Sequence, residues 1–448
     1  MKLLIRNRML LLLILAAFIL RIITMFYSFQ FRQNTDILAY RDYARISFLY
    51  GLDKTYDAKY INFGTLPNNQ PPGSLYIISS AYNADILFSK IYLRLFHLKD
   101  TSASWMNGPL IDGFLRFPSI LADLVIGLFI YKIVKEKASK KMGIIASSLF
   151  LFNPVIIYNS SFWGQMDSLN NLFFYLSLYL LSKKSYFLTL FFFLVSLFIK
   201  LSLLITFPLF ILVIFLSIKS KKRLVLLTAI MVFLTYVLNL PISRDPLWII
   251  NYLVTNWTGV MQNITSFAFN FWWMIFNPFI EIGKPINLFN FSEIQLINAP
   301  LSQTIFWGLP LTVWGFILFF TFLIPLIKRV IELKDRIVKP ENLFLLFSLV
   351  TLIGFIFLPK MHERYMYPVF PLLATYVGLK QKFIFVFLLL SLLNFINLYI
   401  VWHPMTIPIL SYEIMSNHLF QWTMSFITVF VSVIFYIKSI KLLDAKDK

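Results

Sequence analysis

Apolar segments of about 17 to 25 residues recur along most of this chain of 448 residues, and each is long enough to cross a membrane. A hydrocarbon core about 30 Å thick is spanned by a helix of roughly 20 apolar residues. Hydrophobic residues make up 59% of the chain and charged residues only 13%, so no soluble domain beyond loops is expected. The sequence therefore predicts an all-α polytopic membrane protein.

Hydropathy places about twelve membrane-spanning helices along the chain. Their expected ranges are 9–29, 113–134, 142–158, 166–182, 185–199, 202–218, 224–240, 303–327, 341–358, 366–380, 383–402 and 418–437. The first apolar run is longer than a signal-peptide core and has no small-residue cleavage site, so we expect it to be retained. Residues 1–448 are thus predicted to form one integral membrane domain.

Basic residues cluster in the short loops that fall on one side if the predicted spans alternate. That side, which also holds both termini, is predicted to be cytoplasmic. The net charge of +20 would suit nucleic acid, but this loop pattern explains it, and we expect no nucleic-acid partner. The chain has no Cys, which excludes disulfides and thiolate metal sites.

Two outer segments, residues 30–112 and 241–302, are too long and mixed to be simple connectors. Residues 36–52 of the first are predicted to form an amphipathic helix along the membrane surface. Its apolar stripe is Ile37, Tyr40, Ala44 and Phe48, opposite Arg41, Asp42 and Arg45. Farther on, two prolines at 71–72 end one element, and Gly73 permits a sharp turn into an apolar helix.

Ionisable residues distinguish an enzyme from a coupled carrier. A carrier should gather them, with Gly or Pro breaks, near mid-span in two related halves. Here they fall at the outer ends of the spans: Asp36, Asp42, Asp167, Lys200, Lys360, His362, Glu363 and Arg364. We expect these groups to ring an outward-facing cavity.

Asp36 begins the predicted amphipathic helix, so it suits either of two roles. It is an N-cap or first-turn acid, or a general base that takes the proton of an attacking hydroxyl. Residues 163–168 (WGQMDS) combine the Trp163 ring with polar Gln165 and Asp167, a mixture that binds sugars. The alternative for these residues is an interfacial aromatic belt and a helix cap.

Lys200 interrupts an almost continuous apolar stretch between the predicted spans 185–199 and 202–218, which read as a pinched hairpin. It either snorkels to the interface or pairs with a lipid phosphate. Residues 362–364 (HER) offer a guanidinium for bidentate phosphate binding, an imidazole, and a carboxylate that orients either one. The local positive excess favours an anionic ligand.

Taken together, these segments resemble the GT-C superfamily of membrane glycosyltransferases, most closely the prokaryotic proteins similar to the second mannosyltransferase of GPI-anchor assembly. The resemblance spans residues 30–370, and WGQMDS with HERYMYP carries most of its specificity. The matching pieces, in family order, are Asp36, Pro71-Pro72-Gly73, residues 163–168, Lys200, Asn270-Phe271-Trp272 and residues 362–368.

The resemblance implies an inverting glycosyltransferase with the GT-C fold, in the cytoplasmic membrane of a prokaryote and with its site on the outer face. It would move one sugar, mannose by analogy, from a polyprenyl- or dolichyl-phosphate donor to a hydroxyl of a lipid-linked glycan, glycolipid or wall polymer. Asp36 would be the base, and Lys200, His362 and Arg364 would hold the donor phosphate. Orienting or sugar-binding roles would fall to Asp42, Trp163, Gln165, Asp167, Glu363, Tyr365, Asn270 and Trp272.

Two other functions stay open on the sequence. A flippase or carrier of lipid-linked sugars would use the same cations without a base, and a glycan polymerase or ligase would use a lipid diphosphate donor. No cofactor is required. A divalent metal is allowed but not needed, because fixed cations already face the phosphate.

Overall fold

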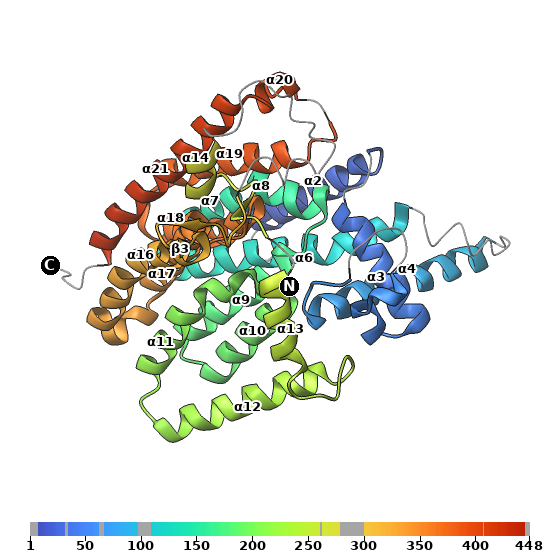
Figure 1. Cartoon of the computed structure of the whole chain (residues 1–448), viewed down its shortest axis with the longest axis horizontal. Coiled ribbons are helices and arrows are strands. Elements are labelled where there is room, and N and C mark those ends of the chain that lie inside the picture. Colours follow the sequence, from blue (N-terminus) through green and yellow to red (C-terminus); the bar gives the residue numbers. More distant parts are fainter. Residues whose placement is uncertain are drawn as a thin grey trace.

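The computed structural model describes residues 8–31, 35–61, 67–96, 109–259, 262–277, 300–405 and 407–443, and helices dominate it (Figure 1). The α-helices are α2 (Arg8–Ser28), α3 (Thr35–Tyr50), α4 (Pro72–Leu95), α6 (Pro109–Lys137), α7 (Lys140–Leu151), α8 (Pro154–Ile157), α9 (Asp167–Ser182), α10 (Tyr186–Ile199), α11 (Phe207–Ser217), α12 (Lys221–Asn239), α13 (Trp248–Gly259), α14 (Phe271–Phe276), α16 (Leu311–Leu333), α17 (Pro340–Phe357), α18 (Val369–Lys380), α19 (Ile384–Val401), α20 (Tyr412–Met415) and α21 (His418–Leu442). Short 3-10 helices are η1 (Asp53–Tyr56), η2 (Ala58–Tyr60), η4 (Leu201–Thr206), η6 (Lys334–Val338) and η7 (Glu363–Met366), and η3 (Tyr158–Trp163) is a π-helix. The strands are β1 (Thr265–Ser266), β2 (Ile305–Phe306), β3 (Leu309–Pro310) and β4 (Met361–His362).

Seven helices of the described chain are long and apolar enough to cross a membrane, or eight if a bent pair counts as one span. The seven lie at residues 8–28, 110–137, 221–239, 311–338, 340–357, 384–401 and 418–442. The bent pair runs from Lys140 to Trp163, with an angle of 48° at its break. These helices confirm an all-α membrane protein with several spans.

The helices divide into a buried centre and a lipid-exposed periphery. In its 18-residue apolar window α17 is 83% buried, whereas α12 is only 11% buried. α18 packs against α17 and is buried at almost every position between Val369 and Gly378. Because α12 is apolar yet exposed, its surface suits contact with hydrocarbon rather than water.

The predicted span 303–327 is wrong at its beginning. α16 begins at Leu311, and the eight residues before it form the antiparallel β2–β3 hairpin. The physical reason is the two-residue turn of Trp307 and Gly308, whose φ angles of 48° and 79° reverse the chain. Hydropathy registers the apolar character of these residues but not the turn.

The predicted apolar stripe of residues 36–52 is correct in part. In α3, Ile37, Tyr40 and Ala44 are buried as expected, but Phe48 is half exposed and Asp42 is buried. The buried face is broader than one stripe because α3 packs against both α4 and α6. The free-energy cost of burying the Asp42 carboxylate is offset by Arg45, because a guanidinium nitrogen of Arg45 lies 3.7 Å from that carboxylate.

The two prolines at 71–72 start a helix as predicted, since Pro72 is the first residue of α4. Gly73 lies in the first turn of that helix, so the chain enters the helix at Pro71 and Pro72 rather than through a turn at the glycine. A Cβ atom on Gly73 would lie 2.5 Å from the Phe198 carbonyl oxygen. The glycine therefore lets α4 approach the end of α10, next to Lys200.

The pinched hairpin predicted around Lys200 is present. α10 and α11 lie antiparallel, with Phe193 stacked on Phe210 at 3.9 Å between ring centroids. At the other end the Tyr186 hydroxyl donates to the Ser217 carbonyl oxygen at 2.9 Å. Lys200 has extended backbone angles at the tip, between the end of α10 and η4. Its ammonium is thus held at the closed end of the hairpin.

Candidate active site

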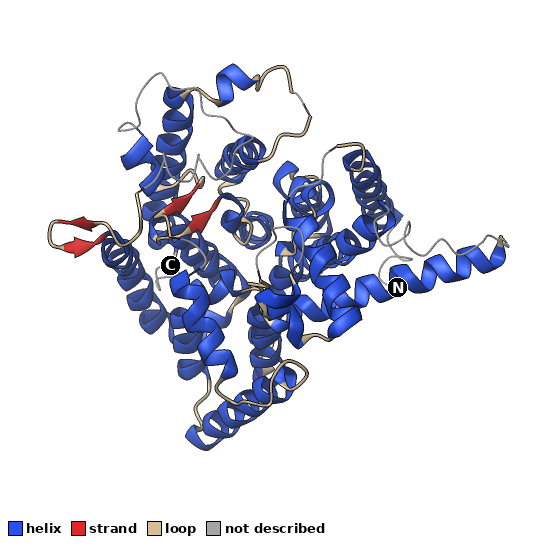
Figure 2. Ribbon diagram, turned by 45° about the vertical axis from the view of Figure 1, so that its right-hand side comes forward, coloured by secondary structure: helices blue, strands red, loops and turns tan. Residues whose placement is uncertain are grey.

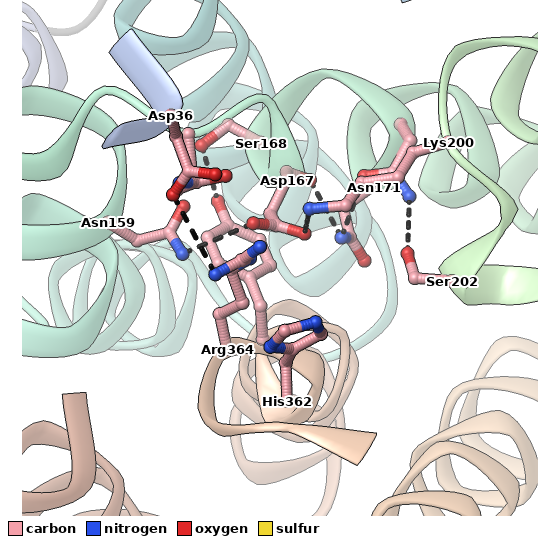
Figure 3. Close-up of polar contacts among 12 residues, drawn as sticks. Asp36, Asn159, Asp167, Ser168, Asn171, Lys200, Ser202, His362 and Arg364 are labelled. Atoms are coloured by element: carbon pink, nitrogen blue, oxygen red, sulfur yellow. Dashed lines mark hydrogen bonds and ion pairs between the residues drawn. The ribbon is translucent and has the colours of Figure 1, made fainter. Parts of the chain in front are cut away.

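Several segments that are distant in the chain bring their polar side chains to one place (Figure 3). Asp36 lies in the first turn of α3, Asp167 begins α9, and Lys200 follows α10. These three residues lie in a row, and Arg364 and His362 face them from the β4–η7 segment (Figure 3). The site cluster, defined as Asp36, Asp167, Lys200, Glu363 and Arg364, therefore joins three positions in the first half of the chain to two in its last quarter.

Asp36 is held through one carboxylate oxygen. Its Oδ2 accepts hydrogen bonds from Trp163 Nε1 at 3.1 Å and from Gln165 Nε2 at 2.5 Å. Arg364 Nη1 lies 3.9 Å from the same oxygen, and the Asp36 side chain stays 32% exposed. The carboxylate is therefore oriented by fixed donors and still reachable, as a general base requires.

The backbone around Gly164 explains how Trp163 and Gln165 reach Asp36. The π-helix η3 ends at Gly164, whose φ of +88° is left-handed. A Cβ atom there would lie 2.6 Å from Ile37 Cδ1 and 3.0 Å from Arg116 Cγ. Only glycine fits this turn without displacing its neighbours. The turn thus fixes the two donors against the start of α3.

Asp167 and Lys200 form a buried ion pair, with 2.6 Å between Oδ1 and Nζ. The other carboxylate oxygen accepts a hydrogen bond from Asn159 Nδ2 at 3.3 Å. Lys200 also lies over the Tyr365 ring, 5.6 Å from its centroid. Sequence reasoning gave Asp167 and Lys200 separate roles, and the structure couples them into one unit.

Glu363 is the buried partner of both neighbours in the HER segment. Arg364 Nη1 donates to its Oε1 at 3.0 Å, and His362 Nδ1 lies 3.6 Å from Oε2. Burial alone would raise the pKa of Glu363, but the Arg364 guanidinium and His362 lower the pKa to about 2. Glu363 is therefore a permanent anion that orients Arg364.

The pKa values of the other two residues of the segment, His362 and Arg364, shift in opposite directions. Burial, and then the charge of Arg364, lower the pKa of His362 below its ordinary value of 6.5. Burial would also lower the pKa of Arg364, but Asp36 and Glu363 raise it. At neutral pH the pair therefore presents a neutral imidazole beside a fixed guanidinium.

A cavity of about 400 Å³ opens beside this cluster. Its polar end is lined by Lys200, Lys360, His362, Arg364 and Gln70. Its other walls are mostly apolar, with Leu204, Ile205, Pro208, Phe316, Phe319 and Phe320 from η4, α11 and α16 beside the polar Ser202 and Thr312. Several cations together with a mostly apolar lining suit an amphiphile with an anionic head.

Two residues expected at the site serve the fold instead. Asn270 caps α14, because its Oδ1 accepts the Trp273 backbone N–H at 3.1 Å. Trp272 Nε1 donates to the Phe357 carbonyl oxygen, at the end of α17, at 2.8 Å. Both side chains are buried. Their segment pairs through β1 with β4, so they support the His362 strand rather than line the cavity.

Asp42 lies on α3, six residues after Asp36, and pairs with Arg45. Tyr365 and Lys360 both line the cavity, and Lys360 has a left-handed φ of 60°. Within the described residues no group of three or more His, Asp or Glu side chains forms a metal-binding set.

Sequence reasoning missed several polar residues that lie inside predicted spans or directly next to one. Asn159 contacts Asp167, and Ser202 accepts from Asn170 Nδ2 at 3.0 Å. Arg21 and Asp123 form a second buried ion pair, at 3.0 Å. Their signal was available, since ionisable residues inside a span are rare and need a partner.

No known family model matches this sequence, and no curated protein matches it either. The chemistry of the site therefore has to be inferred from the geometry of this chain.

Proposed function

We propose that this protein is an inverting membrane glycosyltransferase of the GT-C type. It moves one sugar, with mannose as the first candidate, from a polyprenyl- or dolichyl-phosphate donor to a hydroxyl of a lipid-linked glycan, glycolipid or cell-wall polymer. The observation that carries the proposal is the cavity whose polar end meets Arg364, with the Asp36 carboxylate 3.9 Å beyond that guanidinium.

The cavity supports the donor class. Lys200, Lys360 and Arg364 line its polar end, and the apolar wall between α11 and α16 suits a polyprenyl chain. Charge favours a monophosphate over a diphosphate. These three cations are balanced by Asp36, Asp167 and Glu363, so the site has no large positive excess for a multiply charged head group.

The arrangement of Asp36 supports the reaction type. In the proposed step the acceptor oxygen attacks the anomeric carbon while the bond from that carbon to the phosphate oxygen breaks. The electron pair leaves on the phosphate, where Arg364 and Lys200 stabilise it, and Asp36 takes the proton of the acceptor hydroxyl. A single displacement of this kind inverts the anomeric centre.

The fold is compatible with the twelve-span arrangement of the proposed class. Helices occupy the remaining predicted spans as well, although α9, α10, α11 and α18 are shorter than 18 residues. A location in the cytoplasmic membrane of a prokaryote, with the site on the outer face, follows from the loop charges and the resemblance.

The test is transfer of radiolabelled sugar from a panel of polyprenyl monophosphate sugars into lipid extract by the purified protein. Asp36→Asn is the matched variant, because it keeps the shape of the side chain and removes the base. We expect transfer by the wild type and a loss of about 10²- to 10⁴-fold in the variant, with donor binding kept.

Full activity of Asp36→Asn would remove Asp36 from the proposed role. Transfer only from lipid diphosphate donors would replace the reaction by that of a polymerase or ligase. No transfer at all, with protein-dependent movement of the lipid across a liposome membrane, would identify a carrier.

A further inference from the structure

The β2–β3 hairpin presents an apolar tip that the fold leaves uncovered. It projects from the edge of the helical body (Figure 2). Trp307 is 83% exposed, and Ile305, Phe306 and Leu309 are exposed beside it. A Cβ atom built on Gly308 meets no atom of the described residues within 4 Å, so none of them covers the turn at that glycine. Residues 300–327 contain no charged residue.

The hairpin is nevertheless held firmly at its base. The Leu311 backbone N–H donates to the Thr304 carbonyl oxygen at 2.9 Å, and the Trp314 indole donates to the Phe306 carbonyl oxygen at 2.8 Å. Its tip therefore points in a direction fixed by the first turns of α16.

Trp307 occupies a position that disfavours a bulky residue. The turn between β2 and β3 places Trp307 at φ 48° and Gly308 at φ 79°, and such turns normally use Asn or Asp before Gly. A large side chain in the left-handed region is strained. Its ring stacks only on Phe306 among the described rings, at 5.4 Å, so the fold itself gains little from the placement. Strain of this kind commonly marks a functional contact.

The position of the hairpin indicates what it contacts. α16 is long and apolar enough to span a membrane, so its first residue lies at a membrane boundary. Exposed apolar residues continue along one face of this helix: Val313, Ile317, Phe320, Ile324 and Ile331. The hairpin thus extends a lipid-facing surface into the interfacial zone, where the amphipathic indole of Trp is favoured.

We propose that the β2–β3 hairpin inserts Phe306 and Trp307 into the interfacial layer of the bilayer and fixes the depth of the neighbouring cavity. Thr312 and Phe316, in the first turns of α16, line that cavity. The anchor therefore holds the cavity opening near the lipid head groups. The hairpin has no role in the proposed sugar transfer, and its insertion can be tested without measuring activity.

The experiment uses a nitroxide attached after Trp307→Cys, which labels a single site because the chain has no Cys. The full-length protein is reconstituted in phosphatidylcholine and phosphatidylglycerol vesicles, and the accessibility of the nitroxide to O₂ and to a water-soluble nickel chelate is measured. Ile324→Cys, 61% exposed on α16, is the lipid control. Lys219→Cys, with a side chain 85% exposed between α11 and α12, is the water control.

We expect the ratio of O₂ to nickel accessibility at position 307 to exceed that at 219 several-fold and to approach that at 324. A ratio equal to that at 219 would overturn the proposal. Exclusion of both reagents would also overturn it and would indicate a protein partner, such as a second copy of this chain.

A second label tests the anchor with Trp307 in place. Ile305→Cys should report lipid in the otherwise unchanged chain and shift toward water when Trp307→Ser is added. An Ile305 label that reports water in both backgrounds would contradict insertion, even if Trp307→Cys had released the hairpin.

Discussion

Two clusters of this protein each pair an Arg or Lys with an Asp, and they differ in how far their side chains are exposed. The core cluster consists of Arg21, Asp123, Ser160 and Tyr367. Arg21 Nε lies 3.0 Å from Asp123, and both residues are fully buried. The Ser160 and Tyr367 hydroxyls donate to the two Asp123 oxygens, each at 2.6 Å. Every acceptor of this carboxylate therefore has a donor.

The site cluster, in contrast, is incomplete. Asp36 is partly exposed, and Lys200 and Arg364 line an open cavity. Among the described residues, Arg364 Nε, Gln165 Oε1 and Asn159 Oδ1 around it lack a hydrogen-bond partner, as does Arg21 Nη2 in the core cluster. Unpartnered buried polar groups are costly unless something else binds there. The two clusters therefore differ in exposure: the core cluster is fully buried, whereas the site cluster borders an open cavity.

The two clusters are also joined. The Tyr367 hydroxyl contacts both Asp123 and Ser168 Oγ, the latter at 3.0 Å, and Ser168 follows Asp167 in α9. Ser160 follows Asn159 in the π-helix. The core cluster therefore positions the elements that present the site.

The largest effect should come from Asp123→Ala. Removing one partner leaves the Arg21 guanidinium buried and uncompensated, which costs about 3–5 kcal/mol. We expect a marked fall in the thermal unfolding midpoint in detergent, followed by Trp fluorescence, and loss of transfer. The double variant Arg21→Met with Asp123→Leu should recover most of the unfolding midpoint and most of the transfer activity. An unchanged midpoint for Asp123→Ala would break the comparison between the clusters.

A smaller effect on stability is expected for the pair of Lys200 and Asp167. Variants of this pair also distinguish a structural role from a role in sugar transfer. Lys200→Met should lower stability, and combining it with Asp167→Asn should restore part of it, with a coupling of about 0.5–3 kcal/mol. Transfer should stay lost in the double variant, because the cation toward the phosphate is gone. If that variant transfers sugar normally, the pair is structural, like the core cluster.

Arg364→Gln should act mainly on the donor. Losing a hydrogen bond to a charged group costs about 1.5–3 kcal/mol, which corresponds to roughly 10- to 100-fold weaker binding of polyprenyl phosphate in micelles. Arg364→Lys keeps the charge but not the planar fork, so its affinity should lie between the two. Equal affinity of all three proteins would remove Arg364 from the phosphate site.

The smallest effect concerns pH and His362. Since its pKa lies below 6.5, the ring is neutral at neutral pH and gains a proton only as the pH falls below that value. The added charge faces the donor, so the KM for donor should drop a few-fold on acidification. Stability should fall on acidification, because the unfolded chain binds this proton first. His362→Gln should flatten the change in KM, and an unaltered profile would contradict the assignment.

Much of the framework was predictable from local patterns. The helix start at Pro72, the hairpin around Lys200 and the helical segments follow from proline chemistry and hydropathy. The β2–β3 hairpin was not predicted, because an apolar turn and the first turns of an apolar helix have the same hydropathy. Asn270 and Trp272 were expected at the site from the resemblance, whereas Asn270 Oδ1 accepts the Trp273 backbone N–H as the cap of α14 and Trp272 Nε1 donates to the Phe357 carbonyl oxygen at the end of α17.

The sequence by itself determined that this is a membrane protein and that Asp36, Asp167, Lys200 and Arg364 fall at the ends of apolar segments, since hydrophobicity is a property of each segment alone. Only the tertiary structure decided which charges meet. Asp36 is held by Trp163 and Gln165, and Lys200 by Asp167, because helices distant in the chain pack together. Pairing over such separations depends on how the helices pack, which no local pattern contains.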